Sequence, residues 1–584
     1  MADPIRIANC SGFFGDRLSA AREMVEGGPI DVLTGDWLAE LTMLILARTR
    51  VKRPNGGYAR TFVTQMEQVM GTCMDRGIKV VSNAGGLDPQ GCAEGVAEVA
   101  EKLGLHPKIA YVNGDDLMPR VDELLRDDQI RHFETGDPIK EADFLTANAY
   151  LGCWGIVDAL DRGADIVITG RATDAAIVCG PAAWHHGWSR GDWNQLAGAV
   201  AAGHVIECGT QATGGNYSFF TEVEGLTHTG FPFAEVAEDG SSVISKHDGT
   251  GGQVSVGTVT SQLLYEIGGP EYFGPDVTTR FDSIELEQEG PDRVRMYGVQ
   301  GEPPPSTLKV CINRSGGFRN SMTACLTGLN IEAKAKLIEE AFWASCPYSP
   351  SDYAQVSTAL VRTDQTDPES NEQAAAMFRI TVKDPDEKKT GRAFANAMTE
   401  LALSTIPGFF GVGGGPGGGR PFGVYIPARI PSEQVTQNVV VLGEEAHQIS
   451  SVIPDAPASV TPVSERERVA PAGATQTLPF GTVFGTRSGD KGGNANLGVF
   501  ARSDEAWAFL DDFLTEDRLK ELLPELAELP VDRHRFPGLR SLNFLVHGLL
   551  EEGVAASTRQ DGQAKSLGEW LRARHVELPE SLLS

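Results

Sequence analysis

Short apolar runs recur along the first 220 residues. Each run ends in small and polar residues, and an amphipathic stretch follows most of them. This alternation predicts strands joined by helices, which is typical of a parallel sheet with crossover helices. The runs are Ile5–Ala8, Ile30–Leu33, Ile78–Val81, Ile109–Val112, Ile166–Ile168 and Val205–Ile206. We therefore predict an α/β fold with a mostly parallel sheet for this region.

Polar residues follow every one of these runs, so a parallel sheet would collect them at its carboxyl edge, where open α/β folds bind ligands. The plainer interpretation is that they are turn and helix-cap residues. Six such junctions favour a shared cleft. The candidate site residues at the junctions are Ser11, Gly12, Asp36, Asn83, Gly85, Gly86, Asp115, Arg171, Thr173 and Asp174.

The pattern changes after about residue 213. Short β-like runs are expected at Val254–Val259, Val294–Tyr297, Ala354–Arg362, Met377–Val382 and Asn438–Leu442, with helices at Glu332–Trp343 and Arg392–Ser404. We expect an α/β region over 1–452 with a subdivision near 213–230. A linker rich in Pro, Ala, Ser and Thr would cover 453–476.

Residues 477–584 predict a small α+β domain. We expect strands at Leu478–Phe484, Ala495–Phe500 and Ser541–Val546, and helices at Asp504–Phe513 and Arg518–Leu526. A polar loop between the first two strands is dense in charge and amides. Its candidate ligand-binding residues are Arg487, Asp490, Lys491, Asn494 and Asn496.

Composition narrows the classes of function. Lys plus Arg total 50 and Asp plus Glu total 79 over 584 residues, so the net charge is −29. This acidic balance disfavours nucleic acid and anionic membranes as partners. No apolar run reaches about 18 residues, no secretory signal is evident, and the nine Cys form no CxxC pair. We expect a cytoplasmic protein without a disulfide framework.

Three further segments carry candidate chemistry. His247 is the best general acid/base candidate because it titrates near neutral pH, and Asp248 follows it; the alternative is a polar loop. Arg171 with Asp174 would clamp a carboxylate or phosphate, or else form a local ion pair at a capped helix start. The Gly411–Gly419 run with Arg420 would approach a phosphate or pantetheine through Gly413, Gly414 and Gly415, or else be a flexible loop.

Several familiar signatures are missing from the sequence. The loop Ser11–Gly15, which sits where a dinucleotide loop would sit, does not spell GxGxxG, so nicotinamide chemistry is disfavoured. The sequence contains no GxxxxGK[ST], no GxSxG and no HExxH, which disfavours P-loop, α/β-hydrolase and zincin chemistry. Cys10 and Cys208 at strand ends would be nucleophiles or, more commonly, small buried hydrophobes. The sequence leaves any metal requirement open.

Five segments together resemble a known family: 7–16 (IANCSGFFGD), Asn83–Gly86, Thr169–Asp174, His247–Gly252 and Gly411–Gly419. They are similar to the acyclic terpene utilisation AtuA family. The tail Arg487–Asn496 resembles the AtuA-like C-terminal domain, which has a ferredoxin-type fold. The resemblance spans nearly the whole chain. It implies a role in the catabolism of citronellol- or geraniol-like acids as CoA thioesters, without a defined reaction step.

We expect an enzyme that acts on a branched acyl-CoA or a related carboxylate, as a hydro-lyase (hydratase) or a carbon–carbon lyase. His247 or Asp174 would move the proton, while Arg171 and the amides of Gly85 and Gly86 would hold the oxyanion. Further candidate catalytic carboxylates are Asp36, Asp115 and Asp248. Gly413–Arg420 would receive the nucleotide or pantetheine, and Arg487, Asp490 and Lys491 would close the site from the second domain or a neighbouring subunit.

Two alternatives remain open. The first is a non-catalytic scaffold or regulatory subunit of an acyl-CoA pathway, and the second is an enzyme dependent on nicotinamide or ATP. We assign no cofactor beyond a CoA thioester as substrate, and we expect a homo-oligomer.

Overall fold

The computed structural model describes residues 3–53, 56–140, 143–412, 417–451, 461, 463, 471 and 473–583. The chain forms two compact units. Unit 1 comprises Met1–Asn313, Tyr425–Val554 and Gln563–Ser584, and unit 2 comprises Arg314–Val424 and Ala555–Gly562. Among the described residues, no helix is both long and apolar enough to cross a membrane.

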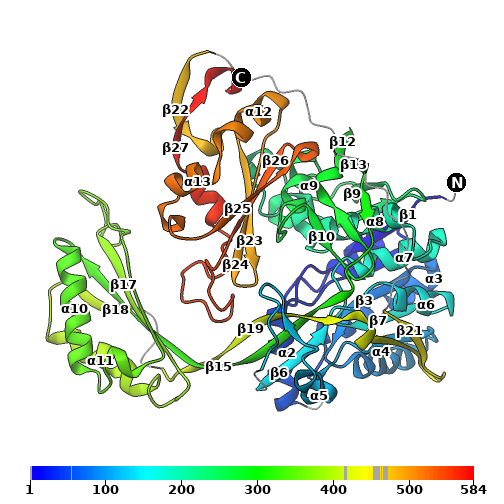
Figure 1. The fold of residues 1–584 in the computed structure, drawn as a ribbon, viewed down its shortest axis with the longest axis horizontal. Coiled ribbons are helices and arrows are strands. Elements are labelled where there is room, and N and C mark those ends of the chain that lie inside the picture. The colour runs from blue at the N-terminus through cyan, green and yellow to red at the C-terminus, as the bar shows by residue number, and fades with distance from the viewer. Residues whose placement is uncertain are drawn as a thin grey trace. The chain divides into compact units, whose positions relative to one another are not determined.

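An eleven-stranded sheet forms the centre of unit 1 (Figure 1). Its five central strands are parallel, in the order β1-β2-β3-β7-β4, which confirms the predicted parallel core. These strands are β1 (Ile5–Asn9), β2 (Val32–Gly35), β3 (Lys79–Gly86), β7 (Ile166–Gly170) and β4 (Ile109–Asn113). Antiparallel strands extend both edges: β8 (Pro232–Val236), β9 (Ser242–Lys246), β13 (Arg293–Tyr297) and β12 (Glu285–Gly290) beyond β1, and β20 (Thr436–Val441) and β21 (His447–Ser450) beyond β4.

Alternate residues of the parallel strands pack into two separate cores. In β7, Ile166 and Ile168 join the core on one face and Val167 joins the core on the other. Helices α1 (Ala20–Gly27), α3 (Arg60–Arg76) and α4 (Pro89–Leu103) cover the first face, and α6 (Trp154–Asp161), α7 (Ala176–His186) and α8 (Trp193–Ile206) cover the second. This period of two, with both faces buried, is what a parallel sheet between helix layers requires.

Two predicted strands are helices. Val205–Ile206 ends α8, in which every residue from Leu196 to Ile206 is buried, so its sequence is apolar all round and lacks an amphipathic stripe. The run 254–259 leads into α9 (Val256–Leu263) because Ser255 and Thr258 form a reciprocal capping box that starts the helix.

Smaller sheets complete the two units. Strands β10 (Glu271–Phe273), β11 (Thr278–Arg280) and β14 (Gln300–Glu302) form one sheet. A seven-stranded sheet includes two long strands, β15 (Thr307–Thr327) and β19 (Arg420–Pro431), whose residues are divided between the units. Its other strands are β5 (Arg131–His132), β6 (Phe144–Ala149), β16 (Gln355–Val361), β17 (Ala375–Asp384) and β18 (Phe409–Val412). Two further helices of unit 1 are α2 (Glu40–Lys52) and α5 (Val121–Arg126).

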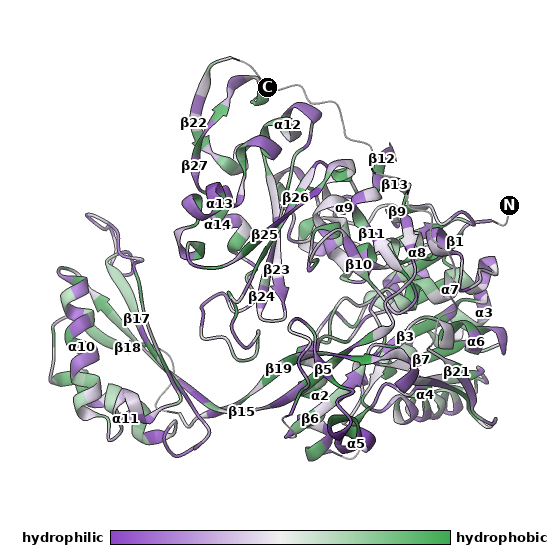
Figure 2. Ribbon diagram, viewed as in Figure 1, coloured by the Kyte–Doolittle hydropathy of each residue, from purple (hydrophilic) through white to green (hydrophobic). Residues whose placement is uncertain are grey.

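Unit 2 packs two helices on its strands. Helices α10 (Ile331–Ser345) and α11 (Arg392–Glu400) share a core with β15, β16 and β17. Figure 2 shows polar and apolar residues along α10, and its buried residues Ile331, Ala335, Ile338 and Phe342 recur at helical spacing. The predicted helix and strand types in this stretch are confirmed, but no sequence feature indicated that 314–424 forms a unit of its own.

The C-terminal part of unit 1 holds a four-stranded antiparallel sheet, in the order β23-β24-β26-β25. Its strands are β23 (Gly485–Lys491), β24 (Asn494–Phe500), β25 (Val531–Phe536) and β26 (Ser541–Val546); its helices are α12 (Asp504–Phe513), α13 (Glu516–Leu522) and α14 (Leu567–Arg572). Strands β22 (Thr475–Pro479) and β27 (His575–Pro579) pair separately. The predicted α+β character is confirmed.

The predicted polar loop at 486–496 is instead a β-hairpin. Thr486 through Lys491 lie on β23 and pair with β24, and the strand predicted at 478–484 ends at Pro479. Polar side chains occupy this hairpin because it packs against polar backbone of the segment after α9 rather than against solvent. Its sequence therefore lacks the apolar alternation of an ordinary strand.

Two asparagines fasten the C-terminal sheet to the segment after α9. Asn496 Nδ2 donates to the Leu264 carbonyl at 2.7 Å and to Asn543 Oδ1 at 2.7 Å, and its Oδ1 accepts the Glu266 N–H at 2.8 Å. Asn543 Nδ2 donates to the Gly268 carbonyl at 2.6 Å. Both side chains are fully buried, so these contacts satisfy backbone groups that lack water.

We predict that Asn496→Ala lowers the free energy of unfolding by about 1–3 kcal/mol, because it leaves buried backbone groups of Leu264 and Glu266 unpaired. Urea unfolding followed by circular dichroism measures the change. Asn371→Ala is the control: that side chain is exposed, so its effect should stay within about 0.5 kcal/mol. Equal effects of the two substitutions would contradict the docking role.

Candidate active site

Arg171 lies directly after β7, and its side chain is only 2% exposed. Its Nη1 donates to the Leu38 carbonyl at 3.0 Å and to Asp174 Oδ1 at 2.9 Å. The guanidinium lies 4.2 Å from the centre of the Tyr150 ring. A buried cation needs such partners, because an isolated charge in a protein interior is costly.

Asp115, after β4, holds the backbone of Arg171 in place. Its Oδ2 accepts the Arg171 N–H at 2.9 Å and Asn148 Nδ2 at 2.7 Å. Burial raises the pKa of Asp115 to about 7 in spite of these hydrogen bonds. Asp115 therefore orients Arg171 rather than facing the open side of the cluster.

Asp36 and Asn83 join the ends of β2 and β3. Asn83 Nδ2 donates to Asp36 Oδ1 at 2.5 Å, and Asn83 Oδ1 accepts the Trp37 N–H at 2.9 Å. Burial and the nearby Asp174 carboxylate raise the pKa of Asp36. The ends of β2, β3, β4 and β7 thus meet in one cluster, as the parallel topology predicts.

A second cation, Lys309 on β15, lies beside the first. Its Nζ donates to Glu40 Oε1 at 3.1 Å, and the Tyr150 hydroxyl donates to the same oxygen at 2.7 Å. Lys309 and Arg171 lower the pKa of Glu40 against the effect of burial. The Glu40 carboxylate is therefore charged and balances Lys309.

Helices α8 and α9 and the C-terminal hairpin supply the remaining ionisable groups. Burial raises the pKa of Glu207, at the end of α8, and of Glu266, just after α9. Lys491 donates from Nζ to the Glu266 carbonyl at 2.6 Å, and burial lowers its pKa. Burial also raises the pKa of Asp490 to about 8. The C-terminal part of the same chain thus places both signs of charge at the cluster.

Several buried polar atoms of this cluster lack a hydrogen-bond partner among the described residues. They are Nε of Arg171, both ring nitrogens of His204, Oε2 of Glu207, Oε1 of Gln262 and the hydroxyl of Tyr425. Buried polar atoms are normally satisfied by protein, water or ligand. Their concentration here marks a place where a polar small molecule or ordered water would bind.

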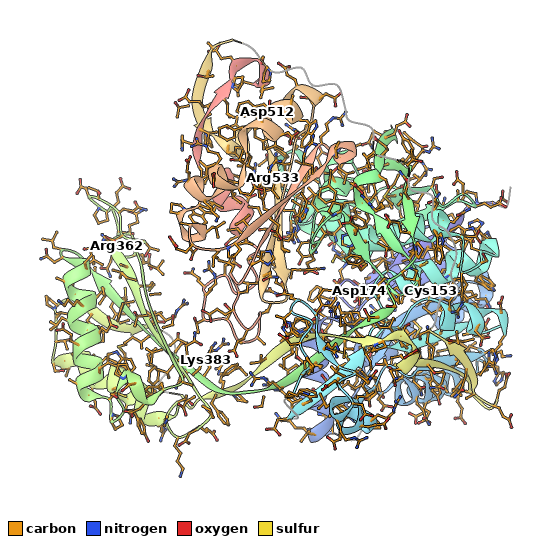
Figure 3. The ribbon with its side chains drawn as sticks, in the orientation of Figure 1. Cys153, Asp174, Arg362, Lys383, Asp512 and Arg533 are labelled. Carbon is orange, nitrogen blue, oxygen red and sulfur yellow. The ribbon has the colours of Figure 1, made fainter. Side chains whose placement is uncertain are left out.

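Three side chains of the cluster are partly exposed to solvent. The side chains of Asp174, Glu40 and Lys309 are 28%, 31% and 33% exposed. Carboxyl groups with raised pKa can donate protons at neutral pH, and the cations can stabilise negative charge on a carbonyl oxygen. Within the described part of the chain, no group of three or more His, Cys, Asp or Glu side chains is arranged to hold a metal ion. The arrangement suits acid–base chemistry on a carbonyl or carboxylate compound. Asp174 is labelled in Figure 3.

His247 and Asp248 are not part of this cluster. His247 is buried, with Nε2 2.9 Å from the Met24 carbonyl and the ring against Phe233, and burial lowers its pKa. Asp248 is exposed. The arrangement gives His247 a packing role at the end of α1.

The other predicted residues divide into three groups. The first group lies at the same sheet edge and comprises Ser11, Gly12, Gly85, Gly86 and Thr173. At Gly12 a side chain would collide with the backbone of Cys208, and at Gly85 with the backbone of Thr169, so glycine permits the close approach of the chains there.

The second group lies on the C-terminal hairpin. Arg487 stacks 4.0 Å from the Tyr265 ring and contacts Gln211, while Asn494 and Asn496 make hydrogen bonds that dock the hairpin. Gly413, Gly414 and Gly415 lie outside the described residues, and Arg420 is exposed in unit 2.

Sequence reasoning missed several members of the cluster. The run Val205–Ile206 predicts a strand before Glu207, whereas Glu207 is the C-terminal cap of helix α8. Lys309 interrupts the apolar run Leu308–Ile312, and a lysine in a buried strand is a signal that could have found it. Tyr150, Glu266 and Tyr425 carry no local signal, because only long-range packing brings them to the site.

Comparisons with known proteins gave two matches. The family model described as "Acyclic terpene utilisation family protein AtuA" matches residues 5–441, and the one described as "AtuA ferredoxin-like domain" matches residues 479–577. No curated protein and no solved structure matches the chain.

We predict that Asp115 makes a contribution to stability that is lost as pH rises from about 4 to 7. The unfolded pKa of an aspartate is about 3.9, so between that value and about 7 the folded state binds the proton more tightly. This contribution is full below about pH 4 and disappears as pH rises through 7. Asp115→Asn should reduce the loss of unfolding free energy between pH 5 and 8 by about 2–3 kcal/mol.

Urea unfolding at pH 5 and pH 8 tests this, with Asp116→Asn as the control. Asp116 is the exposed neighbour and caps Met118 through Oδ1, an acceptor that the amide retains. An unchanged pH dependence in Asp115→Asn, equal to that of the control, would be incompatible with a raised pKa at Asp115.

Proposed function

The chain belongs to the acyclic terpene utilisation AtuA family, and we propose that it is a lyase or hydratase that acts on a branched acyl-CoA or the related free acid. The observation that carries the proposal is the buried cluster around Arg171, in which protonatable carboxyl groups lie beside three cations. The family description, which names acyclic terpene utilisation, favours a branched acyl compound as the substrate.

The chemistry of such a substrate matches the groups present. Addition or removal of water beside a thioester or carboxylate requires a base at the carbon next to the carbonyl and positive charge near the carbonyl oxygen. The Asp174 carboxylate is 28% exposed and contacts Arg171, so a substrate can reach it beside the buried cation, and we assign it the role of base. Arg171 and Lys309 supply the positive charge.

The hairpin β23–β24 has a separate role in this proposal. Its Lys491 donates to the Glu266 carbonyl, and the nearby Glu266 side chain adds to the effect of burial on the pKa of Asp490. The hairpin also covers the segment after α9. Closing the site lowers the local dielectric and strengthens each electrostatic contact inside it. We assign the C-terminal region the role of excluding water from the reacting groups, in the same chain.

The test is ligand-induced stabilisation followed by turnover. Purified protein is heated with CoA, 3-methylbut-2-enoate, 3-methylbut-2-enoyl-CoA, 3-hydroxy-3-methylbutanoyl-CoA, NAD⁺ and ATP in separate samples. A compound present at about 100 times its Kd should stabilise the fold by about 2.7 kcal/mol, a readily measured rise in Tm. We expect the rise with the branched acyl compounds, and interconversion of the enoyl and hydroxyacyl forms by mass spectrometry.

Variants connect the binding to the cluster. Arg171→Lys keeps the charge but cannot contact Leu38 and Asp174 through one planar group, and Asp174→Asn removes the base. We expect Arg171→Lys to lose most of the ligand-induced rise in Tm and Asp174→Asn to lose turnover, each in a protein that still unfolds cooperatively. Asp248→Asn, an exposed carboxylate outside the cluster, is the control and should behave as wild type. Stabilisation by NAD⁺ or ATP alone, or loss of turnover in Asp248→Asn instead, would refute the proposal. No effect of any compound would favour a scaffold.

A further inference from the structure

Glu207 occupies a fixed position at the C-terminal end of α8. Asn9, at the end of β1, donates from Nδ2 to the Ile206 carbonyl at 2.6 Å and to the Glu207 carbonyl at 2.9 Å. These two bonds tie the last turn of α8 to the carboxyl edge of the sheet. The side chain of Glu207 is 7% exposed and therefore has little freedom to leave the cluster.

The two carboxyl oxygens of Glu207 have different surroundings. Oε1 lies 3.2 Å from Nδ1 of His204, one turn earlier on α8. Oε2 is buried and has no hydrogen-bond partner among the described residues. One oxygen is thus next to an imidazole, and the other is left for a group that the protein itself does not supply.

The ionisable groups that face Glu207 lie on three neighbouring segments and on its own helix. They are Asp174 after β7, Glu266 after α9, Lys491 on β23 and Arg171 after β7, together with His204 on its own helix. Burial raises the pKa of Glu207, and Asp174 and Glu266 raise it further against Lys491 and Arg171. Burial lowers the pKa of His204 to about 4, so its ring is neutral at pH 7. Both shifts favour a proton on Glu207 rather than on His204.

We propose that Glu207 is the general acid of the reaction and that it presents its proton from Oε2 to the leaving oxygen of the substrate. This assignment rests on the proposed function. It adds a second catalytic carboxyl group to the site: Asp174 is the accessible one, and Glu207 is the buried one. Such a pair is how one site performs acid and base chemistry at a single pH.

The step balances with these two groups alone. The Asp174 carboxylate takes a proton from the carbon next to the thioester carbonyl, and the resulting enolate oxygen is held by Arg171 and Lys309. The C–OH bond at the β-carbon then breaks with both electrons on oxygen, which takes the proton of Glu207 and leaves as water. Asp174 ends protonated and Glu207 ends as a carboxylate, and one proton passed through solvent restores both. Hydration is the same sequence in reverse.

His204 and Gln262 act as positioning residues. Nδ1 of His204 lies 3.2 Å from Oε1 of Glu207, so the imidazole occupies the space beside that oxygen and leaves Oε2 as the oxygen that faces the substrate in this proposal. Gln262, on α9, donates from Nε2 to the His204 carbonyl at 3.4 Å, and Tyr272 and Phe281 pack against the imidazole at 5.2 and 5.3 Å between ring centres. The two aromatic rings hold the imidazole by packing, and Gln262 holds the backbone of the same residue.

The experiment separates the base step from the acid step. Wild type and variants are incubated in D₂O with 3-hydroxy-3-methylbutanoyl-CoA. Mass spectrometry then follows deuterium uptake at the carbon next to the carbonyl and formation of 3-methylbut-2-enoyl-CoA. Glu207→Gln has the shape of the protonated acid but donates no acidic proton. We expect it to retain deuterium exchange within about 3-fold while dehydration falls by about 100-fold or more, the usual size of a general-acid contribution.

Asp174→Asn and Asp248→Asn complete the comparison. Asp174→Asn should lose exchange and dehydration together, and Asp248→Asn should change neither. Dehydration by Glu207→Gln within about 3-fold of wild type would overturn the assignment of Glu207 while leaving the proposed function intact. If wild type neither exchanges nor converts the probe, the proposed function fails, and the assignment of Glu207 fails with it.

The positioning role of His204 has its own readout. His204→Phe keeps the ring packing against Tyr272 and removes Nδ1, whereas His204→Asn keeps a polar group near that position. We expect His204→Phe to lower kcat and shift the high-pH limb of its profile, with KM little changed, and His204→Asn to recover part of the loss. A folded His204→Phe variant with an unchanged pH profile would exclude the role.

Discussion

The buried guanidinium of Arg171 is the constraint around which the site is built. An unpaired charge at 2% exposure would cost far more than a protein of ordinary stability can tolerate, so the surrounding chain must compensate it. The charge is compensated by the Leu38 carbonyl, the Asp174 carboxylate and the Tyr150 ring. Asp115 accepts the backbone N–H of Arg171 and so fixes its main chain. These partners come from the ends of separate strands and from the segment that precedes α2, so the cluster depends on the parallel topology that brings the strand ends together.

The low dielectric that makes the buried charge of Arg171 costly also separates the carboxyl groups into two kinds. Glu40 contacts Lys309 and is held ionised, whereas burial, with added repulsion from nearby carboxylates, raises the pKa values of Asp36, Glu207, Glu266 and Asp490. The cluster therefore shifts the pKa values of its carboxyl groups in opposite directions. In the proposed function the β23–β24 hairpin excludes water from the cluster, since entering water would weaken both the ion pairs and the pKa shifts.

The parallel core could be predicted from the sequence because both faces of each strand are buried and the apolar runs end at a clear boundary. The junction residues Asp36, Asp115 and Arg171 follow from that boundary, since parallel strands place their ends together. Glu207 could not be located in this way, because the short apolar run before it belongs to a helix that is buried on all sides. Glu266, Tyr150 and Tyr425 reach the site through tertiary packing that leaves no periodic signal. Local composition indicates both Lys491 and His247, and of these two only Lys491 lies at the cluster.

The most direct test of the Arg171 cluster as the active site is a crystal structure of the wild-type protein with 3-methylbut-2-enoate or its CoA thioester bound. The account predicts the acyl carbonyl within hydrogen-bonding distance of Arg171 or Lys309, and the branched carbon between Asp174 and Oε2 of Glu207. A compound bound instead beside His247, with no atom near the buried carboxyl groups, would contradict it.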